Sequence, residues 1–170
     1  MKRVAVIVGS DSDLPTMEAC LTQLRELGIS SETHIFSAHR TPDAAADFAK
    51  NARENDFGVI IAAAGKAAHL AGALAARTTL PVIGVPVRSS TLDGLDALLS
   101  TVQMPSGIPV ATVAINGGMN AGILAAKILA VSDDELLQKL KDYSEEMKNS
   151  VVKKAEKLDA IGYGAYLEQM

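Results

Sequence analysis

Short apolar runs alternate along the chain with longer segments whose apolar residues recur every three or four positions. The runs are rich in Val, Ile and Ala and are bounded by turn residues, a pattern typical of strands buried on both faces of a sheet. The segments between them have helical periodicity. We therefore expect buried strands at about 4–8, 57–63, 81–85 and 110–115. A further, more polar strand is expected at about 31–35, which makes five strands in all.

Helix-start and helix-stop residues bracket the periodic segments. Ser12-Asp13-Leu14-Pro15 opens the first helix and Gly28 stops it. Thr41 and Pro42 open the second, with Thr as the cap and Pro at the first helical position, and this helix is expected to end near Asn55. The remaining segments predict an Ala-rich helix that ends near Arg77, a short helix at about 92–99, and a helix that ends at Leu129.

This order of elements defines a fold class. Strands that alternate with helices at this spacing favour right-handed crossovers and a parallel sheet with helices on both faces. The sequence shows no linker, low-complexity segment or internal repeat. We expect a single α/β domain over 1–170, built as a flavodoxin-like, doubly wound five-stranded parallel sheet in three layers.

The last helix does not fit easily inside such a domain. The segment 132–135 reads as a capping box, and apolar residues follow at 136, 140, 143, 147, 151, 155, 158 and 161. A stripe of about 26 residues is roughly 39 Å long. The helix could lie along its own domain, but its length favours a C-terminal extension, at about 132–161, that packs on a neighbouring subunit.

Composition and charge narrow the class of protein. Hydrophobic residues make up 48% and aromatic residues 4%, so small side chains must pack closely, in the core and in any oligomer interface. The net charge of −4 lacks the basic character of a nucleic-acid binder. Cys20, the single cysteine, lies in a helical pattern and is expected to be a buried apolar residue. No apolar run suits a signal peptide or a membrane span, so we expect a cytoplasmic protein without membrane or nucleic-acid partners.

Three loops carry most of the candidate chemistry. Ligands of open parallel sheets bind beyond the carboxyl ends of the strands, where the strand order reverses. For the order 2-1-3-4-5, that point lies between the first and third strands, with the loop after the second strand beside it. The loops there are 9–13, 37–42 and 64–69, and they contain two of the three histidines.

The first loop, rich in hydroxyl groups, precedes a helix. Its N–H groups and the helix dipole could bind an anion, although Ser10 and Ser12 could equally be simple caps. Asp13 could compensate the dipole or accept hydrogen bonds from a ribose diol.

The second loop is more informative, because Ser37, His39 and Arg40 stand within six residues. The planar guanidinium of Arg suits a phosphate, and His can give and take a proton near neutral pH.

The third loop, from Gly65 through Lys66 and Ala67 to His69, presents backbone amides that suit a flat ring. His69 is either a second polar contact or only a helix-start residue. The glycine-rich segment 117–122 lacks the Walker lysine and is expected to serve tight helix–strand packing. His34 is expected to be structural. No cluster has metal-ligand spacing, and no dinucleotide-binding motif follows the first strand, so neither metal nor cofactor is expected.

Six sequence blocks resemble the 5-(carboxyamino)imidazole ribonucleotide mutase family of bacterial purine biosynthesis. The resemblance covers nearly the whole chain, and its blocks are Gly9-Ser10 with Ser12-Asp13, then 37–42, 67–70, 81–87, 102–105 and 110–116. The family moves a carboxyl group from the exocyclic nitrogen of its ribonucleotide to ring carbon 4, through enclosed carbon dioxide and without ATP, biotin or metal. Its members form homo-octamers with sites at subunit boundaries.

The resemblance implies a role for each matching position. Ser10, Ser37 and Arg40 would contact the phosphate and Asp13 the ribose diol, while His39 would transfer protons. Further substrate contacts are expected from the residues that share these loops, namely Ser12, Gly65, Lys66, Ala67 and His69.

Two alternatives to this function remain open, and one of them comes from a departure from the family pattern. Lys66 stands where bacterial mutases often have Gly, and Ala71 replaces a frequent Pro. The animal-type relatives, which use free carbon dioxide, also have a basic residue here, but Ser-Asn follows it. A direct carboxylase is therefore one alternative. The other, from a different class, is a non-catalytic sugar-phosphate or flavin-binding module on the same fold, which would keep Ser10, Asp13 and Arg40 but would not need His39.

Overall fold

Five parallel strands form the centre of the molecule, in the order β2-β1-β3-β4-β5. The computed structural model describes residues 1–170. The strands are β1 (Arg3–Val8), β2 (Ser31–Ile35), β3 (Phe57–Gly65), β4 (Val82–Val87) and β5 (Ala111–Thr112). The order reverses between β1 and β3, as the sequence predicts, so the first three strands end side by side at one edge of the sheet.

Alternate side chains of each strand enter two separate cores. On β1, Val4, Val6 and Val8 face one core, while Ala5 and Ile7 face the other. The same alternation continues along β3 and β4. Both faces are apolar, which explains why these strands read as uninterrupted hydrophobic runs.

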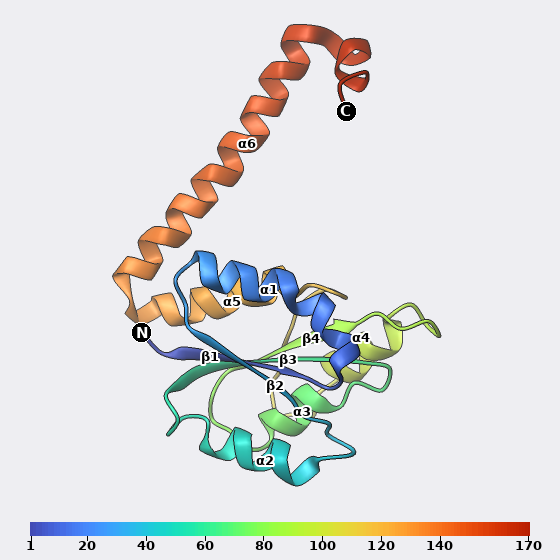
Figure 1. Ribbon diagram of the computed structural model, residues 1–170, viewed down its shortest axis with the longest axis vertical. Helices are drawn as coiled ribbons and strands as arrows, with labels where there is room; N and C mark the ends of the chain where they lie inside the picture. The colour runs from blue at the N-terminus through green and yellow to red at the C-terminus, as the bar shows by residue number, and fades with distance from the viewer.

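Helices cover both faces of the sheet and complete the three expected layers (Figure 1). α1 (Leu14–Glu26) and α5 (Gly118–Leu129) pack on one face. α2 (Pro42–Asn51) and α3 (Leu70–Ala75) pack on the other, and α4 (Leu95–Val102) lies beside β4. The flavodoxin-like architecture predicted from the sequence is confirmed.

Several element boundaries differ from the predicted ones. β5 has two residues instead of six, because Pro86 of β4 has no N–H to donate toward it. The ladder gives way there to single bonds such as Asn116 N to Pro86 O, at 2.8 Å. α4 begins at Leu95 because Asp93 and Gly94 both have positive φ. The predicted ends near Asn55 and Arg77 were too late, since α2 and α3 end at Asn51 and Ala75.

Two predicted helix caps were wrong in detail. Thr41 occupies the N-cap of α2, but its hydroxyl makes no capping bond. It accepts a hydrogen bond from Ser37 N at 2.9 Å, which closes the preceding loop. The cap before the last helix is Asp133, one residue after Ser132, and it accepts from Leu136 N.

Small residues allow α1 and α5 to approach closely. A Cβ added to Gly118 would lie 2.6 Å from Thr16 O, and one on Gly122 would lie 3.1 Å from Cys20 O. These two glycines therefore serve helix–helix packing against α1, where helix–strand packing was predicted, although α5 as a whole also packs on β3 and β4. Cys20 is fully buried there, and its burial raises the pKa of the thiol to about 12, so the expected role as a buried apolar residue is confirmed.

The last helix, α6 (Asp134–Leu167), projects away from the rest of the molecule (Figure 1). Leu136 is fully buried, but the apolar stripe beyond it is open, with Met147 50% and Val151 65% exposed. Gly162 breaks the helical geometry near its end. The helix thus does not lie along its own domain. No helix of the structure combines the length and hydrophobicity that crossing a membrane requires.

Candidate active site

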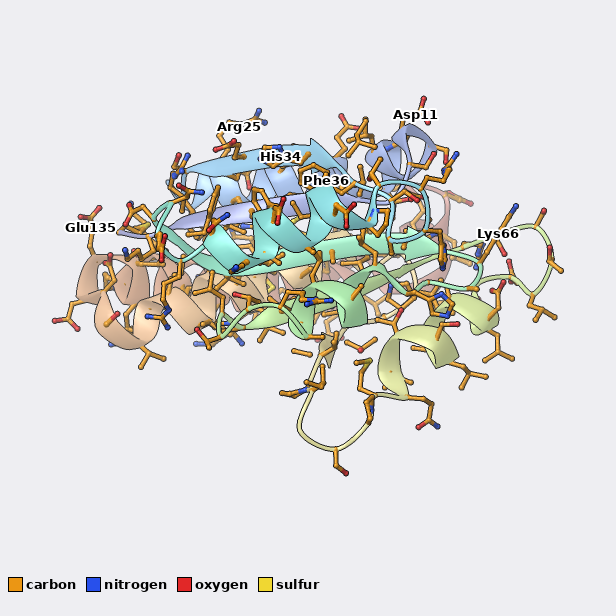
Figure 2. All side chains as sticks on the ribbon, turned by 90° about the horizontal axis from the view of Figure 1, so that it is seen from below. Asp11, Arg25, His34, Phe36, Lys66 and Glu135 are labelled. Atoms are coloured by element: carbon orange, nitrogen blue, oxygen red, sulfur yellow. The ribbon has the colours of Figure 1, made fainter.

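A cleft of about 550 Å³ lies at the carboxyl edge of the sheet. The three loops singled out in the sequence line it, and Figure 2 shows Asp11 of the first and Lys66 of the third at this side of the molecule, away from Glu135 of α6. The structure brings together in the cleft all ten residues predicted for the site, namely Ser10, Ser12, Asp13, Ser37, His39, Arg40, Gly65, Lys66, Ala67 and His69.

Hydroxyl groups organise the first loop, which passes through a short 3₁₀ turn before α1. Ser10 Oγ accepts a weak bond from Ser12 N at 3.4 Å and lies 3.1 Å from Ser12 Oγ. Ser10 is therefore the cap of the turn, one of its two predicted roles. The loop is partly open, so these hydroxyl groups remain accessible to a ligand.

Asp13 is the one buried carboxylate of the cleft, with 8% of its surface exposed. Desolvation raises the pKa of its carboxyl group; the hydrogen bond with the Ser10 backbone opposes this change, and the nearby Asp11 adds to it. Asp13 makes no side-chain capping bond to α1. Its oxygens are thus not used in helix capping, which leaves them available to accept hydrogen bonds from hydroxyl groups.

The second loop is a turn closed by its own side chains. Ser37 Oγ accepts from Arg40 N at 3.1 Å, and Thr41 Oγ1 donates to Ser37 O at 3.2 Å. The turn places His39 and Arg40 at its tip, and both are exposed. The guanidinium of Arg40 makes no hydrogen bond or ion pair within the protein, so it remains free to bind an anion.

The third loop leaves β3 through a strained residue. Lys66 has φ of +55°, a left-handed conformation that costs a residue with a side chain about 1–2 kcal/mol. The preceding Gly65 lies against β4, and a Cβ there would be 3.2 Å from Val87 O. The loop thus runs close to the sheet and turns Lys66 outward beside the cleft.

The two histidines of these loops form a pair. His39 Nε2 lies 2.7 Å from His69 Nδ1, and the rings meet edge to face with centroids 4.9 Å apart. One nitrogen must donate a hydrogen and the other must accept it. His69 is therefore a polar partner of His39, and it also stands at the N-cap position of α3 without a side-chain capping bond. The pair can hold or move one proton inside the cleft.

The sequence reasoning missed a fourth loop, after β4. Arg88, Ser89 and Ser90 also line the cleft. The sequence signal that could have identified them is their position directly after an apolar run, which places them at the same edge of the sheet as the other loops. His34 lies outside the cleft and packs against Phe36 and Phe48, with ring centroids 5.4 Å and 4.8 Å away. No group of three or more His, Cys, Asp or Glu side chains is arranged to hold a metal ion.

The family model described as AIR carboxylase matches residues 3–150, which include the whole sheet and its covering helices. The chain belongs to the AIR carboxylase family. Among its relatives, the N5-carboxyaminoimidazole ribonucleotide mutase of Thermotoga maritima is 58% identical over 99% of both chains.

A second group of AIR carboxylase relatives is longer. The chloroplastic phosphoribosylaminoimidazole carboxylase of Vigna aconitifolia is 51% identical over 95% of this chain, but the match covers 29% of that protein. Among solved structures, Treponema denticola PurE superposes with a TM-score of 0.84 at 29% identity, covering 91% of this chain and 97% of that one. The family, the enzyme class and the fold predicted from the sequence are therefore confirmed.

Proposed function

We propose that this protein is an N5-carboxyaminoimidazole ribonucleotide mutase, an isomerase of purine biosynthesis. The observation that carries the proposal is the pair of His39 and His69, 2.7 Å apart in a cleft that Arg40 also lines. A non-catalytic binding module would need the positive charge of Arg40 but not the two paired histidines. The 58% identity to the mutase of Thermotoga maritima supports the same assignment.

The cleft supplies a group for each part of the ribonucleotide. Arg40 offers a planar, permanently charged donor set that suits a phosphate, and the hydroxyl groups of Ser10, Ser12 and Ser37 line the cleft with it. The buried carboxylate of Asp13 would accept hydrogen bonds from the ribose diol. The backbone of Gly65–Ala67 would face the flat aminoimidazole ring.

The reaction requires two proton transfers. Cleavage of the N–C bond of the carbamate releases carbon dioxide and leaves electron density on nitrogen, which takes a proton. Ring carbon 4 then attacks carbon dioxide and loses its own proton. We assign both transfers to His39, because a group within hydrogen-bond reach can donate in the first step and accept in the second. His69 would fix the orientation and tautomer of the His39 ring.

The released carbon dioxide must stay beside the ring until carbon 4 captures it. Holding both fragments in one site makes recapture effectively unimolecular and is a large part of the catalysis. The longer carboxylase relatives are the alternative, and this chain matches 29% of the Vigna aconitifolia protein but 99% of the Thermotoga maritima mutase. The higher identity to the mutase, 58% against 51%, favours the mutase.

The proposed function is tested by supplying the carbamate ribonucleotide to the purified protein, without ATP, biotin or added metal. We expect rapid conversion into 4-carboxy-5-aminoimidazole ribonucleotide, followed by the absorbance of the product or by a coupled assay. Tight binding of the ribonucleotide without any turnover would instead favour the non-catalytic module.

We also propose that the protein is a cytoplasmic homo-oligomer, an octamer by the family resemblance, in which α6 extends from the single domain and packs on a neighbouring subunit. The exposed stripe of α6 supports this, because apolar side chains such as Val151 (65% exposed) and Leu158 (39%) gain stability only when another surface covers them.

The net charge of −4 supports a small-molecule ligand rather than a nucleic acid.

Truncation tests the role of α6. A chain that stops after Lys141 keeps the buried Leu136 and the packed Leu140, so its domain should still fold. Light scattering is expected to show a mass several times 17.7 kDa for the full chain and a much smaller one for the truncated chain. A full-length protein that is a monodisperse, active monomer would contradict the proposed assembly.

A further inference from the structure

The basic end of the cleft consists of Lys66, after β3, and Arg88, after β4. Arg40 follows β2, at the other end of the strand order. With neighbouring strands about 4.8 Å apart, the chain leaves β2 and β4 at points about 14 Å from each other. The cleft therefore presents cations at two separated places, whereas a phosphate needs only one of them.

The backbone at the basic end is strained to hold these residues in place. Four non-glycine residues of the chain have positive φ, namely Asp56, Lys66, Asp93 and Asn116. Asn116 and Asp93 both contact Arg88. Asn116 Oδ1 accepts a hydrogen bond from Arg88 N at 2.9 Å, and Asp93 Oδ1 lies 3.0 Å from Arg88 Nε. A third residue with positive φ is Lys66 itself. Strain of this kind persists where the surrounding structure imposes it, and it gathers at ligand sites.

Arg88 remains able to bind an anion in this arrangement. The contact with Asp93 uses Nε, and the Arg88 side chain is 61% exposed. The terminal NH₂ groups donate to no acceptor within the protein, and they form the edge that binds a carboxylate through two parallel hydrogen bonds. Lys66 likewise makes no hydrogen bond or ion pair. Gly65 and Val87 are partners in the ladder between β3 and β4, so Lys66 and Arg88 leave the sheet side by side and one ligand group can reach both.

We infer that Lys66 and Arg88 bind the carboxylate of the substrate and product, and that Arg88 makes the cleft select carboxylated ribonucleotides over the ribonucleotide without the carboxyl group. The inference rests on the proposed function. A phosphate at Arg40 and a ring beside the histidine pair leave the carboxyl group as the anion nearest the basic end. The three cations then match a ligand with one phosphate and one carboxylate.

Calorimetry with two ligands tests this inference. Aminoimidazole ribonucleotide and its 4-carboxy derivative differ by one carboxylate, so their affinity ratio isolates the contact. Arg88→Gln is expected to weaken binding of the carboxylated ligand about 10- to 100-fold, the value of a charge-assisted contact, and to change binding of the other ligand less than twofold. Arg25→Gln, at an exposed arginine far from Lys66 (Figure 2), should change neither.

A second variant separates binding from folding. Lys66→Gly removes the charge and also relieves the backbone strain of the positive φ. It should therefore weaken binding of the carboxylated ligand selectively, without lowering the Tm. Equal losses for both ligands, or no loss in either variant, would overturn the inference and leave the proposed function intact. A wild-type protein that binds neither ribonucleotide would overturn the proposed function and the inference together.

Discussion

Replacing His39 by Asn is expected to lower the turnover number by roughly 100-fold or more, the usual contribution of general acid–base catalysis, while the ribonucleotide still binds. Asn keeps a polar side chain of similar size but cannot carry the proton between nitrogen and carbon 4. It can still interact with His69, which lies 2.7 Å from His39 Nε2 in the wild-type protein. Steady-state kinetics and calorimetry on the same preparation separate the two effects.

The matched control for this variant is His34→Asn. His34 stacks on Phe36 with centroids 5.4 Å apart, and it is not among the residues that line the cleft. The control should keep near-normal turnover. Near-normal turnover in His39→Asn itself would remove His39 from the mechanism and leave the histidine pair without a catalytic role.

The second large effect is expected from Arg40→Ala. Arg40 is exposed at the tip of the second loop, where Ser37 Oγ accepts from its backbone N–H at 3.1 Å. Its guanidinium has no protein partner, so its removal should leave the fold intact. Binding of the ribonucleotide should weaken about 10- to 100-fold, the value of one charge-assisted contact. Binding of the dephosphorylated riboside should hardly change.

The comparison of the two ligands makes this result specific. Arg53→Ala, an exposed arginine that is not among the cleft residues, should affect neither ligand. Equal losses of the ribonucleotide and the riboside in Arg40→Ala would mean that Arg40 acts on the ring or the sugar, and that another group holds the phosphate.

The fold was predictable because both faces of the sheet are covered. Buried parallel strands require unbroken runs of Val, Ile and Ala, and β1 and β3 contain such runs. β2 (Ser31–Ile35) was placed to the residue although it is largely polar and only partly covered. The boundaries that were wrong depend on the tertiary surroundings. The length of β5 depends on the absent N–H of Pro86 in a neighbouring strand, and the start of α4 depends on two positive φ values, at Asp93 and Gly94.

The sequence predicted which loops form the site, but it did not predict the contacts between their side chains. The rule that ligands lie at the carboxyl edge was enough to gather all ten residues into one cleft. The 2.7 Å contact between His39 and His69 could not be predicted, because 30 residues separate them and only the fold sets their approach. Arg88 was not predicted because the rule points to the loops around the reversal of strand order, and β4 lies beyond that reversal.

The central claim, that the protein is a mutase, is tested most directly by the source of the product's carboxyl carbon. The carbamate ribonucleotide is labelled at that carbon and converted in excess unlabelled bicarbonate. If carbon dioxide is released and recaptured inside one closed site, most of the label stays in the product. Complete loss of label to the solution, with efficient carboxylation of aminoimidazole ribonucleotide at low bicarbonate, would contradict the account and identify a direct carboxylase.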